Sequence, residues 1–74
     1  MTSFADVMPP GGVFRDWIVR QDFTGEWVVT LHYLATGQGH PLPDGAAWSR
    51  PVWLTVARRP TRAAAVAWIR DLTP

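Results

Sequence analysis

The residue pair best suited to chemistry is His32 with Asp16, one acid and one base on neighbouring predicted strands. If a turn at residues 22–25 closes a hairpin, strand alternation places Asp16 directly opposite His32. Such a pair could exchange a proton with a substrate, or it could be a simple cross-strand polar contact. We favour the contact, because no nucleophile accompanies the pair and Ser3 and Ser49 lie in predicted loops. The sequence therefore predicts that the protein is not an enzyme.

Metal and cofactor binding are not indicated. His32 and His40 are the only histidines, neither has a partner at the spacing of zinc ligands, and the chain has no cysteine. Gly37-Gln38-Gly39 is followed by neither a helix nor a lysine, unlike phosphate-binding loops. We predict no metal site and no cofactor.

The charge is divided unevenly along the 74 residues. Residues 1–44 hold five acidic residues and two arginines, a net charge of −3, whereas residues 45–74 hold five arginines and one acidic residue, a net charge of +4. All seven basic residues are arginine, which suggests a GC-rich genome such as that of an actinobacterium or one of its phages. Four arginines are predicted around the start of a helix, where they could bind an anion or form a solvated basic edge: Arg50, Arg58, Arg59 and Arg62.

The elements that position these residues follow from periodicity. Residues 13–21 and 26–34 are rich in β-branched and aromatic residues and flank an Asp-Phe-Thr-Gly turn, and residues 52–58 form a third strand. Thr61 is a good N-cap for a helix over residues 61–71, whose apolar stripe has helical spacing: Ala65, Trp68, Ile69 and Leu72. We predict an α+β fold, a three-stranded antiparallel β-meander with one C-terminal α-helix packed on one face. Residues 1–12 would be a flexible N-terminal arm, and residues 13–74 a single small domain with a long loop at 36–51.

Strand alternation divides the predicted sheet into two faces. The helix is expected to cover one face: Trp17, Val19, Trp27, Val29, Leu31, Tyr33, Val52, Leu54 and Val56, with Arg15 opposite Tyr33. The second face mixes apolar and polar groups: Phe14, Asp16, Ile18, Arg20, Val28, Thr30, His32, Leu34, Trp53, Thr55 and Arg59. One helix cannot cover both faces, so the arm or the long loop folds over the second face, or a partner does.

A function follows from that second face. We predict a small non-enzymatic protein-binding or accessory module that docks through it, onto another protein or a second copy of itself. The expected contacts are Phe14, Ile18, Arg20, His32, Leu34 and Trp53, with Trp48 and Arg50 from the loop. The alternative is a nucleic-acid-binding protein that uses the four arginines named above. The longest apolar run, residues 63–69, is seven residues, so we expect no membrane span and a cytoplasmic location.

Two families share part of this pattern. The helix Thr61-Arg62-Ala63-Ala64-Ala65-Val66-Ala67-Trp68-Ile69, with Trp53 nine residues before Arg62, resembles the last third of the MbtH-like proteins, although their Asn-x-Glu-x-Gln-x-Ser-x-Trp-Pro signature is absent. That resemblance implies a non-catalytic partner of peptide-synthetase adenylation domains. The helix is also similar to that of the arm-type DNA-binding domain of phage integrases, through Thr61, Arg62, Ala65, Trp68 and Ile69. This second resemblance implies DNA binding.

Overall fold

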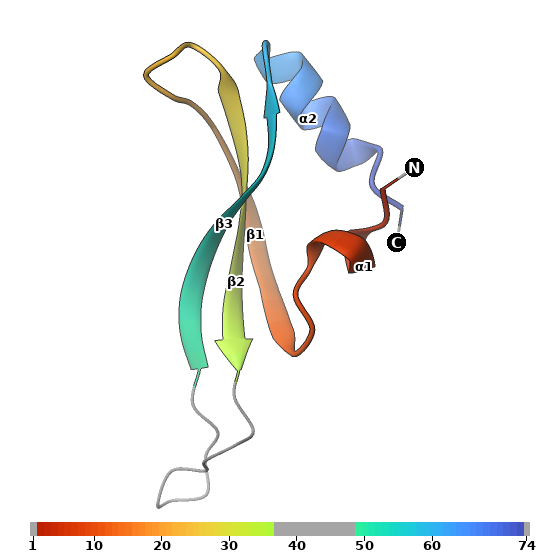
Figure 1. Cartoon of the computed structure of the whole chain (residues 1–74). Helices are drawn as coiled ribbons and strands as arrows, with labels where there is room; N and C mark the ends of the chain where they lie inside the picture. The colour runs from red at the N-terminus through yellow and green to blue at the C-terminus, as the bar shows by residue number, and fades with distance from the viewer. Residues whose placement is uncertain (1, 37–48, 74) are drawn as a thin grey trace, which may run out of the picture.

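The computed structural model describes residues 2–36 and 49–73. Along the chain, its elements are α1 (Phe4–Val7), β1 (Gly12–Gln21), β2 (Trp27–Thr36), β3 (Ser49–Arg59) and α2 (Arg62–Arg70). The strands form one antiparallel sheet in the order β1-β2-β3, and α2 packs on one face of it (Figure 1). The predicted α+β meander with a C-terminal helix is confirmed.

A tight turn between β1 and β2 sets the register of the hairpin. The Gly25 N–H donates to the carbonyl of Asp22 at 3.2 Å, and Gly25 has a φ of 91°, which a side chain would disfavour. The Asp22 carboxylate accepts bonds from the backbone N–H and the hydroxyl of Thr24. As predicted, this turn places Gln21 opposite Trp27 and, five residues earlier, Asp16 opposite His32.

A β-bulge on each edge strand changes which residues share a face. In β1 the register shifts at Arg15, so Phe14 rather than Arg15 lies opposite Tyr33. In β3 it shifts at Val56, so Ala57 lies opposite Val29 and Arg59 opposite Trp27. Because one inserted residue moves the side chains beyond it to the other face, placements predicted from unbroken strands were wrong at several positions. Phe14 and Arg59 lie on the face that α2 covers, not on the second face, and Val56 is an unpaired bulge residue rather than a paired core position.

The core lies between the sheet and α2. Val29 and Leu31 on the central strand and Ala65 on α2 are fully buried, with 0% of their surface exposed. The hydroxyl of Thr61 accepts the N–H of Ala64 at 3.1 Å and so caps α2, as predicted. Trp68 packs edge-on against Trp17 with a 6.0 Å separation between ring centroids. The apolar stripe of the helix therefore faces the sheet as the sequence predicts.

Residues 2–12 lie within the segment predicted as a flexible N-terminal arm, and the short helix α1 in it packs on the helix side of the sheet. Ser3 caps the short helix α1, and the ring of Phe4 lies edge-on to Phe14 and Trp17 at 5.5 and 6.1 Å. The Phe4 N–H donates to the carbonyl of Thr73 at 2.8 Å, so the two ends of the chain lie side by side (Figure 1). The sequence interpretation missed this packing because it depends on tertiary contacts. The Phe4 ring and backbone hydrogen bonds to residues near the C-terminus hold a segment that is rich in Pro and Gly.

The strands also extend into the region predicted as the long loop. β2 continues to Thr36 and β3 begins at Ser49, so Arg50 is a strand residue rather than a loop residue. Trp48, predicted as a loop contact, lies outside the described residues.

Candidate functional site

The face of the sheet opposite α1 and α2, here called the open face, is the candidate site. The two bulges and the registers align its side chains in rows that cross all three strands. The rows, named here for one member each, are the proline row (Val13, Leu34, Pro51), the histidine row (Asp16, His32, Trp53), the threonine row (Ile18, Thr30, Thr55) and the arginine row (Arg20, Val28, Arg58).

The histidine row is a preorganised platform. Nδ1 of His32 lies 2.8 Å from Oδ1 of Asp16, and since a carboxylate only accepts, Nδ1 is the donor. The imidazole stacks on the indole of Trp53 with ring centroids 4.8 Å apart and an interplanar angle of 3°. Trp53 remains 58% exposed although His32 covers one of its ring faces. A large rigid aromatic side chain held in one orientation, yet open to solvent, is the kind of group that anchors an interface.

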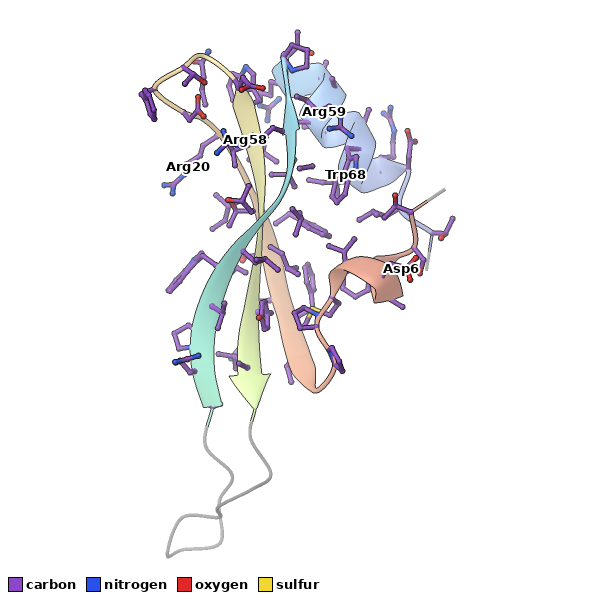
Figure 2. The ribbon with its side chains drawn as sticks, viewed as in Figure 1. Asp6, Arg20, Arg58, Arg59 and Trp68 are labelled. Carbon is purple, nitrogen blue, oxygen red and sulfur yellow. The ribbon has the colours of Figure 1, made fainter. Side chains whose placement is uncertain are left out.

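Two arginines flank a buried valine in the arginine row. Val28 lies between Arg20 and Arg58 in the register and is only 7% exposed, although neither α1 nor α2 covers this face. Long arginine side chains can cover apolar neighbours while their guanidinium groups stay in water. Figure 2 shows Arg20 on the side of the sheet away from α2, and Arg59 and Trp68 on the side of α2.

Arg58 also ties β3 to the β1–β2 turn. Its Nη1 lies 2.6 Å from Oδ2 of Asp22. The hydrogen bond from the Thr24 hydroxyl, together with Arg58, holds the pKa of Asp22 below its ordinary value of 3.8, against a smaller opposing effect of partial burial. Arg58 is therefore paired within the chain, although 52% of its side chain remains exposed.

The four arginines predicted around the helix start do not form one cluster. Arg50 lies opposite Ala35, at the far end of the sheet from Arg59, which lies opposite Trp27. Arg58 is on the open face, whereas Arg59 is on the helix side and donates to the carbonyl of Arg58 at 2.6 Å. Arg62 is the exposed first residue of α2. Arg58 and Arg59 are consecutive strand residues and so point to opposite faces, and Arg50 lies near the start of β3 rather than in a loop beside the helix.

Most of the predicted docking residues do share the open face. Of the six contacts predicted on the sheet, Ile18, Arg20, His32, Leu34 and Trp53 lie in its rows and Phe14 does not. Of the two predicted loop contacts, Arg50 lies opposite Ala35, on the other face, and Trp48 is outside the described residues.

Sequence reasoning did not assign three members of the open face to it, namely Val13, Pro51 and Arg58, and it placed Pro51 at the end of the long loop. Arg58 could be assigned to this face only once the bulge at Val56 was known. Val13, which is 50% exposed, had no signal of its own, because its face depends on the bulge at Arg15.

Residues 2–12 do not cover the open face. Phe4, the ring that α1 contributes, packs on Phe14 and Trp17, on the opposite side of the sheet. The alternative in which the N-terminal arm folds over the second face is therefore wrong for its described residues, 2–12. The other predicted cover, the long loop, falls mainly on residues 37–48, outside the described residues.

No enclosed pocket is found in the described part of the chain. Within residues 2–36 and 49–73, no three His, Asp or Glu side chains are grouped so that they could hold a metal ion. Neither helix in these ranges has the length and apolar character needed to cross a membrane.

No protein-family model matches the chain, and no curated protein or solved structure is detectably similar to it.

Proposed function

We propose that this protein is a non-enzymatic protein-binding module that docks through its open face. The observation that carries the proposal is Trp53, which is 58% exposed and held by a stack on His32 that Asp16 in turn orients. We place this activity in the cytoplasm, as the absence of cysteine and of a long apolar run suggests.

A protein partner fits the charge of the open face better than a nucleic acid does. Asp16 is 62% exposed within the histidine row and would repel phosphate. Of the two arginines, Arg58 is paired with Asp22, which leaves Arg20 as the cation free to balance Asp16. A face with mixed and nearly balanced charge suits the polar rim of a protein interface, whereas nucleic-acid sites carry a clear excess of positive charge. The partner should therefore present an apolar centre with both an acidic and a basic group beside it.

Photo-crosslinking from the open face tests the proposal. A benzophenone amino acid replaces Trp53 in one variant and Val66 in a control, since Val66 is 37% exposed on α2, on the other side of the sheet. On irradiation in source-cell extract we expect position 53 to give a defined protein adduct, identified by mass spectrometry. Unmodified chain should compete with this adduct, and Trp53→Glu chain should not. The proposal fails if position 53 gives no competable protein adduct beyond that of position 66.

The nucleic-acid alternative is tested separately with single-stranded DNA and RNA oligonucleotides of mixed sequence. We expect no saturable binding at low salt. Tight binding that weakens steeply with salt, and that Arg20→Gln reduces, would favour nucleic acid instead and contradict the protein-binding proposal.

A further inference from the structure

We infer that the partner on the open face is a second copy of this chain, packed face to face about a two-fold axis over the threonine row. This inference rests on the proposed function and names its partner. Symmetric pairs are the commonest assemblies of soluble proteins, and their interfaces must be complementary to themselves. The rows of the open face meet that requirement in one particular arrangement.

Consider a two-fold axis that lies between the two sheets, perpendicular to the strands, along the threonine row at Thr30. This axis places each strand against the same strand of the second copy, running in the opposite direction. The histidine row of one copy then lies over the arginine row of the other, since these rows lie on either side of the threonine row. On β1, Asp16 faces Arg20 of the second copy, and the reverse pair forms as well. On β3, Trp53 faces Arg58 of the second copy, so the exposed indole meets a guanidinium group.

Other two-fold arrangements lack this complementarity. An axis parallel to the strands would stack β1 on β3 and place Arg20 against Arg58 of the second copy. An axis over the histidine row would place Asp16 against itself. Like charges directly opposed at an interface are costly, so both arrangements are disfavoured. Among these arrangements, the threonine-row axis is the one that pairs opposite charges on β1 and keeps like charges apart.

The edges of the sheet are less suited to association than its face. Each edge strand, β1 and β3, carries a bulge, at Arg15 and Val56, which interrupts the row of backbone groups that a new strand would need. Pro51 removes a further donor from β3. These features direct association toward the face.

The size of the face limits the affinity. Three strands at a spacing of about 4.8 Å give a face roughly 14 Å wide. A face this narrow reaches the standard interface area of about 800 Å² per partner only if most of the strand length takes part. We therefore expect a dimer that forms in the micromolar range rather than one that is permanent.

Charge exchange on β1 tests the arrangement. In a dimer of Asp16→Arg, the new arginine at position 16 of each copy faces Arg20 of the other copy. In a dimer of Arg20→Asp, the new carboxylate at position 20 of each copy faces Asp16 of the other copy. Each variant alone should raise the dimer dissociation constant by about tenfold or more, measured by sedimentation equilibrium. A mixture of the two variants should form a heterodimer, because both facing pairs on β1 then have opposite charge.

Circular dichroism shows whether the charge variants fold. If they do not fold, a second pair of variants tests the same interface. Trp53→Glu should abolish the dimer, and Phe23→Glu, at a turn position that is 100% exposed and outside the rows, should not.

The inference is overturned if the wild type stays monomeric into the millimolar range, or if the dimer survives Trp53→Glu. It is also overturned if the mixed charge variants fail to associate. A monomer that still gives the competable adduct at position 53 with a different protein would overturn the second copy as partner but leave the proposed function standing.

Discussion

At the residue scale, the side chain of Asp22 connects two separate parts of the chain. Its carboxylate accepts from the N–H and hydroxyl of Thr24 and pairs with Arg58, so one residue links the turn to the third strand. Arg58 in turn belongs to the arginine row, beside buried Val28. The turn therefore helps to hold one end of the open face in shape.

This connection predicts how stability responds to acid. Hydrogen bonding to Thr24 and the charge of Arg58 lower the pKa of Asp22 in the folded chain below 3.8. A lowered folded-state pKa stabilises the fold fully above the unfolded-state value, and that contribution is lost as pH falls through the folded-state value. We expect Asp22→Asn to be less stable than wild type at neutral pH, with the difference shrinking below pH 3.8. Urea unfolding at several pH values, followed by tryptophan fluorescence, measures the stability of the wild type and of Asp22→Asn. A stability difference that does not change with pH would show that the carboxylate charge has no such role.

At this scale, sequence reasoning located the turn and the pairing that follows from it. Asp22 and Gly25 identified the turn, and from it the pairing of Asp16 with His32 followed by counting. The stack of His32 on Trp53 was not predicted, because it requires the register of β3, which a long connection separates from β2.

At the scale of elements, α2 holds the domain together. Its Trp68 packs against Trp17, and Trp17 in turn contacts Phe14 and Phe4, so three elements meet in one aromatic cluster. The cluster brings α1 and the start of β1 into the same core as α2.

We expect Trp68→Ala to lower the free energy of unfolding by about 3 kcal/mol, because truncating a large packed aromatic loses both burial and contacts. For so small a domain that loss is most of the total stability. Val66→Ala on the same helix is the matched control, since Val66 is 37% exposed, and it should change stability by about 0.5 kcal/mol or less. Thermal unfolding monitored by circular dichroism compares the two; equal midpoints would show that the aromatic cluster does not stabilise the fold.

Elements were predicted better than their irregularities. All three strands and α2 were predicted from alternation, turn residues and an N-cap, with shorter strand ends than observed. The bulges at Arg15 and Val56 were not predicted. Apolar residues lie near each bulge, so the polarity pattern fits an unbroken strand as well as a strand with an inserted residue. Those two residues account for the misplacement of Phe14 and Arg59.

At the scale of the whole molecule, the chain is asymmetric. Both helices and both ends of the chain lie on one side of the sheet, and the other side presents the open face (Figure 1). Among residues 2–36 and 49–73, both helices pack on the same side of the sheet. The sequence indicated this imbalance, since β2 is apolar on both faces, but it could not show that α1 joins the helix side.

Docking through the open face is tested most directly by a dilution series of ¹H–¹⁵N NMR spectra, with the backbone amides assigned. We expect amide shifts that depend on concentration to cluster in the histidine, threonine and arginine rows, and to be absent from α2 and in Trp53→Glu. Spectra that do not change with concentration, or changes confined to α2 and the β1–β2 turn, would contradict docking of a second copy on this face.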